Sequence, residues 1–247
     1  MLAKCQKDPF LRLFKTTVVS CEKWSQPNQT WLKETVKKPK KGKRGQKSSP
    51  IESKDAYEIE LEDTILFPEG GGQPCDFGSL LNIPISYVCR TKTGRILHKS
   101  PAPLSIGSSV DVKIDWTRRY DHMQHHTGQH LISAVAQRLF GFETTSWWLS
   151  KYPAECNIDL NVKEISDEEI KAIETSANEY IRKALKLNVH EIHTSDDLKE
   201  FIATHEKIKQ DKLPENGPLR IVEIPSLEFN TCCGTHLTCT SQIQALK

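Results

Sequence analysis

The hydrophobic pattern of this chain changes once, near Trp116, and that change limits the folds that the chain can adopt. Before it, short segments alternate apolar and polar residues with the period of strands, as at Val110, Val112 and Ile114. After it, apolar residues recur at the spacing of a helix, most clearly over residues 121–140. Both patterns in succession predict a fold of the α+β class.

The first part of the chain, residues 1–117, is predicted to be a β-barrel domain built from short strands. A glycine-rich loop over residues 68–78 and a basic insertion over about 37–50 interrupt it. Because strand-like segments flank the insertion, we expect it to be a hairpin loop. The expected strands cover residues 10–19, 57–61, 65–67, 85–90, 96–99 and 110–116.

The second part, residues 118–247, is predicted to be a domain of mixed helices and strands. Asp121 and Gln124 resemble a capping box for the first helix, which ends at Gly141. Ser166 and Glu169 cap a second helix in the same way. The expected strands cover residues 154–160, 189–193 and 219–224.

Composition excludes several classes of protein. The chain has 247 residues, of which 37% are hydrophobic and 27% charged, so it can bury a core. No apolar run approaches the roughly 18 to 20 residues of a membrane span, and the first residues lack the apolar stretch of a secretory signal. Eight cysteines in such a chain are expected to be reduced thiols or metal ligands. We therefore expect a cytoplasmic protein.

Positive charge is concentrated in the insertion, whereas the rest of the chain is net acidic. Its composition predicts a solvated loop that cannot bury a core. It is also a candidate arm for attracting phosphates, which needs no ordered structure. The seven basic residues are Lys37, Lys38, Lys40, Lys41, Lys43, Arg44 and Lys47.

Four of the nine histidines lie within nine positions, at the start of the first predicted helix. Residues four apart share a helix face, so either His122 and His126 or His126 and His130 can reach one metal ion. His125 points about 100° away from His126 and is expected to be solvated or hydrogen-bonded. The alternative is a polar helix start that binds no metal.

A second group of ligand-type residues occurs about 100 residues later, in NTCCGTHLTC. Cys232 and His236 repeat the spacing of four after an apolar strand. Imidazoles combined with one thiolate suit a tetrahedral, borderline-soft ion, so the sequence predicts one zinc ion. Cys233 and Cys239 are rival thiolates, and an ordinary buried cysteine is the alternative for each.

The sequence GGGQ favours an ordinary tight turn, and the alternative is a close approach of the backbone to a substrate or to the wall of the zinc site. It is not a phosphate-binding P-loop, because no Gly-Lys-Ser/Thr follows. The residues concerned are Gly70, Gly71, Gly72 and Gln73. The tryptophan pair at 147–148 can stack a base, but a core position on a strand is the favoured explanation.

Three motifs occur together in this chain: LFPEGGGQP at 66–74, HTGQHL at 126–131 and CCGTH at 232–236. In this combination the chain resembles the free-standing alanyl-tRNA-editing proteins, the AlaX family. These are similar to the editing domain of alanyl-tRNA synthetase and the second additional domain of threonyl-tRNA synthetase. The resemblance spans nearly the whole chain. It implies a small β-barrel followed by a zinc-containing α+β editing domain of that synthetase type.

The resemblance also implies a set of ligands for the zinc ion. The histidine motif falls on His126 and His130, and the CxxxH motif falls on Cys232 and His236. This choice leaves out His122. Gly70, Gly71 and Gly72 would then contact substrate, with Gln73 as a candidate for orienting water or substrate. The chain departs from many relatives at Cys233, where they have glycine.

The function that the resemblance implies is trans-editing, the deacylation of mischarged tRNA(Ala), chiefly Ser-tRNA(Ala), with Gly-tRNA(Ala) as a second candidate. An alanine pocket rejects either amino acid by only about 1 to 3 kcal/mol, so a separate hydrolytic site is needed. Serine is larger than alanine, so that site must recognise the hydroxyl group. Thr127 is the candidate for this contact, and a bond to helix backbone is the alternative.

Two other classes of protein are compatible with parts of the pattern. Four protein ligands resemble a closed structural zinc site, so a non-catalytic, translation-associated RNA-binding module is the main alternative. A zinc peptidase is disfavoured, because HTGQH lacks the glutamate of HExxH. The basic residues of the insertion are candidate tRNA contacts.

Overall fold

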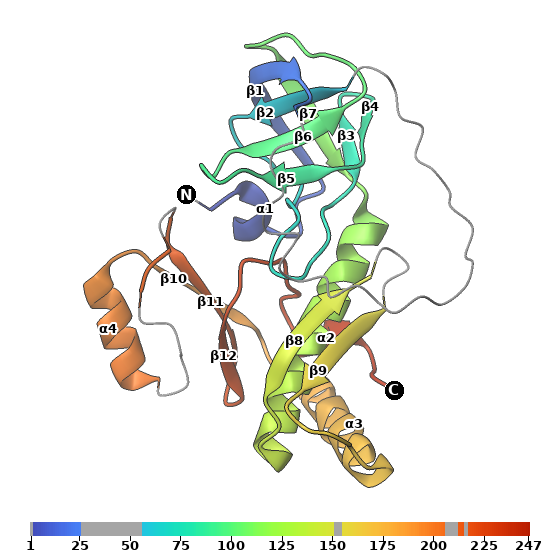
Figure 1. Ribbon diagram of the computed structural model, residues 1–247, viewed down its shortest axis with the longest axis vertical. Helices are drawn as coiled ribbons and strands as arrows, with labels where there is room; N and C mark the ends of the chain where they lie inside the picture. Colours follow the sequence, from blue (N-terminus) through green and yellow to red (C-terminus); the bar gives the residue numbers. More distant parts are fainter. Residues whose placement is uncertain (1, 26–55, 151–154, 206–211, 215–216) are drawn as a thin grey trace.

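A computed structural model describes the chain except for residues 1, 26–55, 151–154, 206–211 and 215–216 (Figure 1). The predicted α+β class is confirmed. The seven basic residues predicted to contact tRNA, Lys37, Lys38, Lys40, Lys41, Lys43, Arg44 and Lys47, lie outside the described residues. Among the residues that are described, no helix is both long and apolar enough to cross a membrane.

In the described part of the first 115 residues, a seven-stranded antiparallel sheet curls into a nearly closed, barrel-like form (Figure 1). Its spatial order is β4-β3-β7-β1-β2-β6-β5. Apolar residues alternate along β7 and point into the sheet's own core, while the polar residues between them are exposed. The strands are β1 (Leu13–Lys23), β2 (Tyr57–Leu61), β3 (Gly78–Leu80), β4 (Ile83–Ile85), β5 (Val88–Arg90), β6 (Ile96–Ser100) and β7 (Ser109–Ile114).

Strands β1 and β2 pair in antiparallel register, with Lys23 opposite Tyr57. The predicted hairpin around the insertion is therefore confirmed for the strands that flank it. Residues 65–67, predicted as a strand, instead form an irregular buried segment. The strand predicted over 85–90 is divided between two strands, since Ile85 ends β4 and Val88–Arg90 form β5, and β3 was not predicted.

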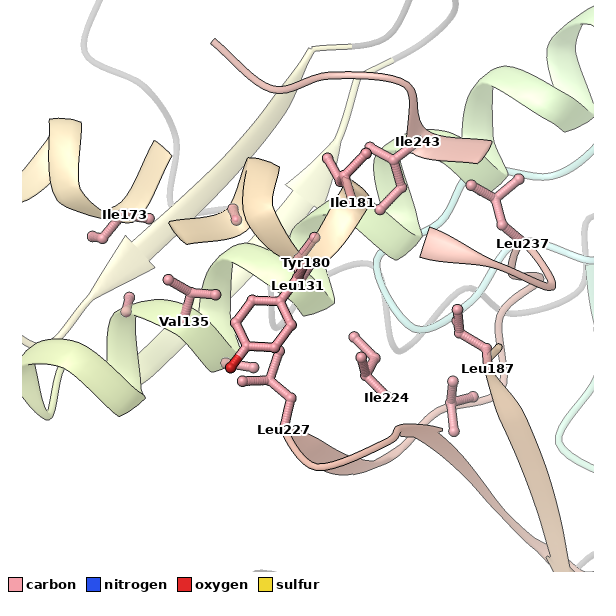
Figure 2. Packing of buried hydrophobic residues seen from close by; sticks show 14 of the residues in the cluster. Leu131, Val135, Ile173, Tyr180, Ile181, Leu187, Ile224, Leu227, Leu237 and Ile243 are labelled. Atoms are coloured by element: carbon pink, nitrogen blue, oxygen red, sulfur yellow. The ribbon is translucent and has the colours of Figure 1, made fainter. Parts of the chain in front are cut away.

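The rest of the chain combines helices with two small antiparallel sheets, ordered β10-β11-β12 and β8-β9. Helices α2 and α3, the last 3₁₀ turn and the β10–β12 sheet enclose a second hydrophobic core (Figure 2). These elements are α2 (Trp116–Phe140), β8 (Thr144–Leu149), β9 (Cys156–Leu160), α3 (Asp167–Arg182), β10 (Asn188–Ile192), α4 (Ser195–Thr204), β11 (Leu219–Ile224), β12 (Glu228–Thr231) and η2 (Thr240–Ile243). A short helix, α1 (Lys4–Lys7), precedes the barrel.

Helix α2 begins earlier than the sequence predicts. Its N-cap is Asp115, whose side chain accepts a hydrogen bond from the Arg118 backbone amide, so the capping box predicted at Asp121 is wrong. The helix ends at Gly141, as predicted, where φ is 70°. Because α2 starts at Trp116, it runs from the barrel-like sheet into the second core (Figure 1).

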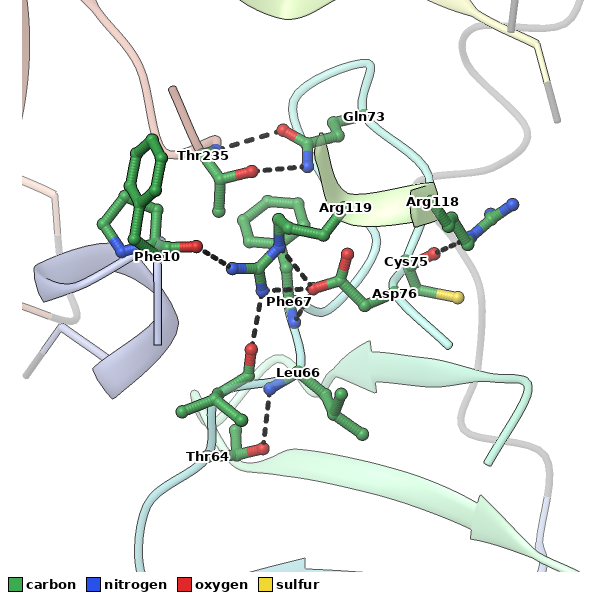
Figure 3. Close-up of polar contacts among 12 residues, drawn as sticks. Phe10, Thr64, Leu66, Phe67, Gln73, Cys75, Asp76, Arg118, Arg119 and Thr235 are labelled. Carbon is green, nitrogen blue, oxygen red and sulfur yellow. Dashed lines mark hydrogen bonds and ion pairs between the residues drawn. The ribbon is translucent and has the colours of Figure 1, made fainter. Parts of the chain in front are cut away.

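A fully buried ion pair fixes the start of α2 against the barrel (Figure 3). The Arg119 guanidinium donates to the Asp76 carboxylate, to the Pro9 carbonyl at 2.8 Å and to the Ile65 carbonyl at 2.6 Å. Asp76 also accepts a hydrogen bond from the Phe67 backbone amide. This one guanidinium therefore joins three separate segments of chain, which explains the irregular path of residues 65–67.

We expect Asp76→Asn to lower the free energy of unfolding by about 3 to 5 kcal/mol, because it leaves the Arg119 charge buried without its counter-charge. Urea denaturation followed by circular dichroism measures the change. Asp111→Asn, at an exposed position on β7, is the matched control. A loss below about 1 kcal/mol, the average effect of a point mutation, would contradict this role.

Candidate metal centre

Four metal-ligand side chains converge from two distant parts of the chain. His126 and His130 lie one turn apart on α2, and Cys232 and His236 lie in the segment after β12. Their donor atoms all lie within 4.8 Å of one another. Cys232 Sγ is 3.3 Å from His126 Nε2 and 3.2 Å from His236 Nε2. Tetrahedral zinc would hold sulfur and nitrogen about 3.5 Å apart, so the donor set fits such an ion.

The electrostatics of the cluster also favour a cation. Burial lowers the pKa of His126 and of His236, which favours the neutral form of each ring. Burial alone would raise the pKa of Cys232, but the positive charge that the neighbouring histidines carry when protonated, together with their hydrogen bonds, brings it well below its ordinary value. A thiolate beside neutral imidazoles is the protonation state that metal binding requires.

His130 has the opposite shift. Burial alone would lower its pKa, but the neighbouring Cys232 and Glu228 side chains raise it to about 9. Because a metal ion binds the neutral ring, it would compete with a proton for His130.

Gln73 fixes the orientation of the His126 ring. Its side-chain oxygen lies 2.8 Å from His126 Nδ1 and accepts a second bond, of 3.1 Å, from the Thr235 backbone amide. Because that oxygen can only accept, Nδ1 carries the proton and Nε2 presents its lone pair to the cluster. The Gln73 amide nitrogen donates to the Thr235 hydroxyl at 2.9 Å (Figure 3). Gln73 thus ties the glycine-rich loop to both ligand segments.

The other two ligand rings have Nδ1 partners as well. Thr127 Oγ1 lies 3.4 Å from His236 Nδ1 and accepts a hydrogen bond from the Leu237 backbone amide at 3.1 Å. Glu228 Oε2 lies 3.7 Å from His130 Nδ1. Such outer partners fix the tautomer and ring orientation of metal-binding histidines. The sequence singled out Thr127 for another role, and it gave no indication of Glu228.

The glycine-rich loop forms one wall of the cluster. Gly70 and Gln73 exchange backbone hydrogen bonds of 3.1 Å, which closes the tight turn that the sequence predicts. Gly72 has a φ of 83°, and a Cβ there would lie 2.9 Å from the Trp147 ring. The Trp147 ring in turn lies 4.4 Å from the His126 ring, centroid to centroid. Trp147 is therefore packed between the loop and a candidate ligand.

The remaining candidate ligands lie outside the set of four donors. Cys233 is exposed, and its sulfur lies 2.9 Å from the position of a Cβ on Gly71. His125 Nδ1 lies 2.9 Å from the Asp121 carbonyl oxygen, in agreement with its predicted orientation. His122 is buried, and neither ring nitrogen has a hydrogen-bond partner among the described residues. Burial, with the nearby arginine charges, lowers the pKa of His122 to about 3.

Arg220 on β11 positions the Cys232–His236 segment through its backbone. Its Nη1 donates to the carbonyl oxygens of Cys232 and Gly234, both at 2.9 Å. Close packing adds a second constraint, since a Cβ on Gly234 would lie 2.1 Å from His126 Cε1. Sequence reasoning missed Arg220, although a lone arginine in the apolar strand LRIVEI is a usable signal.

Comparison with known proteins gives relatives over the full chain. No family model matches. The alanyl-tRNA editing protein Aarsd1 of Bos taurus is 41% identical over 249 residues, covering 100% of this chain and 50% of that protein. The Rattus norvegicus protein of the same name is 40% identical, covering 98% and 53%. The alanine–tRNA ligase of Methanobrevibacter smithii is 30% identical, covering 80% and 22%. The chain thus spans about half the length of the editing proteins that it matches.

We expect Glu228→Ala to weaken zinc binding by about 10- to 100-fold, because the His130 ring loses the carboxylate that orients it. Glu228→Gln, which keeps an acceptor oxygen, should have a smaller effect. Competition with a chromophoric chelator measures the affinity. Glu179→Gln, at an exposed position on α3, serves as the control. Equal affinity of the Glu228→Ala protein and the wild type would remove Glu228 from the site.

Proposed function

Because this chain is a member of the alanyl-tRNA editing protein family, we propose that it is a trans-editing hydrolase for mischarged tRNA(Ala). Ser-tRNA(Ala) is the main proposed substrate and Gly-tRNA(Ala) the second. The observation that carries the proposal is the buried cluster of His126, His130, Cys232 and His236, with the glycine-rich loop as its wall. The reaction is hydrolysis of the ester between the amino acid and the terminal ribose.

We further propose that the four donors hold one zinc ion. When bound, zinc supplies Lewis-acid polarisation of the ester carbonyl. The protein supplies the geometry: Gln73, Thr127 and Glu228 each hold one imidazole with its other nitrogen turned toward the cluster. Gln73 has one amide hydrogen left for a water molecule or a substrate group, since the other is donated to Thr235.

The domain organisation remains part of the proposal. We assign residues 1–117 to a barrel domain and residues 118–247 to an editing domain of the alanyl/threonyl-tRNA synthetase type. Support comes from the two hydrophobic clusters, which are separate except that Trp116 packs against both. The basic residues over 37–47 are proposed to attract the tRNA backbone, on the strength of their charge. A cytoplasmic location is proposed with them.

We expect His126→Ala to reduce deacylation of Ser-tRNA(Ala) by at least about 100-fold, because loss of one donor removes several kcal/mol of electrostatic stabilisation. Release of labelled serine measures the rate, and circular dichroism checks the fold. His125→Ala on the same helix is the control, since His125 lies outside the cluster. If the zinc-loaded wild type does not accelerate the reaction, the alternative of a non-catalytic RNA-binding module with structural zinc takes its place.

We propose Thr127 for recognition of the serine hydroxyl. Its oxygen already accepts the Leu237 amide bond, so its hydroxyl proton is the group left to interact with serine. We expect Thr127→Val to lower the preference for Ser-tRNA(Ala) over Ala-tRNA(Ala) by about 10-fold. Paired single-turnover rates measure this preference, and Thr127→Ser is the control.

The zinc content of the same variants tests whether Thr127 also orients the His236 ring. Valine also removes the oxygen next to His236 Nδ1, so weaker zinc binding is expected from loss of ring orientation. A Thr127→Val protein with reduced zinc affinity but unchanged serine preference would leave Thr127 as a positioning residue only.

A further inference from the structure

A pocket of about 310 Å³ lies directly beside the candidate metal centre. Gln6 and Arg90 line it from the barrel side, and Arg220, Cys232 and Cys233 line it from the β11–β12 side. The Gln6 amide nitrogen donates to the Cys233 carbonyl at 2.9 Å, which links the two sides. Because Cys232 belongs to both the pocket and the donor cluster, a ligand in the pocket would lie next to the reacting ester.

The pocket has two positive charges without a carboxylate partner. Among the described residues, neither Arg90 nor Arg220 takes part in an ion pair with aspartate or glutamate. Arg220 is only 5% exposed, and its Nε has no hydrogen-bond partner in the described part of the chain. Arg90 has only weak partners, the Gly94 carbonyl at 3.2 Å and the Gln6 side-chain oxygen at 3.4 Å.

Among the described residues that line the pocket, the one anionic group is the Cys232 thiolate, and a metal ion held by the cluster would take up its charge. The two guanidinium groups can therefore accommodate a further anion. A buried charge that lacks a counter-charge is unfavourable, and an anion between the two arginines would offset that cost. The planar fork of arginine matches the oxygens of phosphate and carboxylate better than those of other anions. In an aminoacyl ester the carboxylate of the amino acid is already esterified. The anions that the proposed substrate can place beside the ester are therefore its phosphodiester groups.

We propose that this pocket binds a phosphate group at the 3′ end of the tRNA and so places the terminal ribose at the metal centre. The inference rests on the proposed function and extends it to the contact that holds the substrate's end. Arg90 is the group to test. It lies on the barrel side of the pocket, whereas Arg220 also holds the Cys232–His236 segment and its replacement would disturb the ligands.

The test compares two substrates that differ in phosphate. Seryl-tRNA(Ala) carries the phosphates, and 2′(3′)-O-seryl-adenosine has the same ester without them. We expect Arg90→Gln to lower kcat/KM for seryl-tRNA(Ala) by about 10- to 100-fold, the effect of a charge-assisted hydrogen bond. The kcat/KM for the nucleoside ester should stay within about twofold of the wild-type value. That substrate has no phosphate, so a contact to phosphate cannot contribute to its binding or its reaction. Arg90→Lys should restore part of the loss.

Arg95→Gln is the matched control, because Arg95 lies on the same barrel, is partly exposed and pairs with Glu60. Equal losses on both substrates would show that Arg90 is structural and would overturn the inference. Unchanged kinetics on seryl-tRNA(Ala) would overturn it too. Inorganic phosphate is also added as an inhibitor of deacylation. If Arg90→Gln changes only this inhibition and leaves the kinetics on seryl-tRNA(Ala) unchanged, the pocket binds free phosphate and the assignment to tRNA is wrong.

A binding measurement separates this inference from the proposed function. Uncharged tRNA(Ala) and the same tRNA without its last three nucleotides are titrated against the wild type and Arg90→Gln. We expect the substitution to weaken binding of the intact tRNA only. The slope of the logarithm of the binding constant against the logarithm of the salt concentration should become smaller by about 1. This result can be obtained even if no deacylation is detected, in which case the proposed function fails and the pocket assignment stands. Equal effects on both tRNAs would reject the pocket assignment.

Discussion

The buried ion pair between Arg119 and Asp76 determines where the two halves of the candidate site meet. Arg119 lies in the second turn of α2, and Asp76 follows Gln73 by three residues in the glycine-rich loop (Figure 3). The pair therefore fixes the loop relative to the helix. Seven residues further along the same helix, His126 Nδ1 lies 2.8 Å from the side-chain oxygen of Gln73.

The donor cluster depends on tertiary structure more than on the two motifs that contain it. Each imidazole is held by a group from a different place: the loop supplies Gln73, the helix itself supplies Thr127, and β12 supplies Glu228. Each partner leaves one ring nitrogen for the cluster. This arrangement explains how a thiolate and three imidazoles can lie within 4.8 Å in a buried site, with the positions of all four fixed by neighbours.

Short sequence motifs correctly predicted those helix ends that are determined by residues close in the sequence. The capping box at Ser166 and the end of α2 at Gly141 are present as expected. The apolar alternation of β7 continues in the sequence to Trp116, past the true cap at Asp115, and for that reason local signals place the start of α2 too late, at Asp121. Glu228 could not be predicted at all. Its place beside His130 depends on how β12 packs against α2, and no local pattern of the sequence encodes that contact.

The order of the ligands along the chain has a consequence during synthesis. His126 and Cys232 are 106 residues apart, and ribosomes add about 5 to 20 residues per second, so the histidine pair exists for several seconds before its sulfur partner. Histidine pairs on a nascent helix bind copper and nickel more tightly than most other divalent ions. The late cysteine completes a donor set of one sulfur and three nitrogens, which suits a tetrahedral ion such as zinc better than ions that prefer square-planar surroundings.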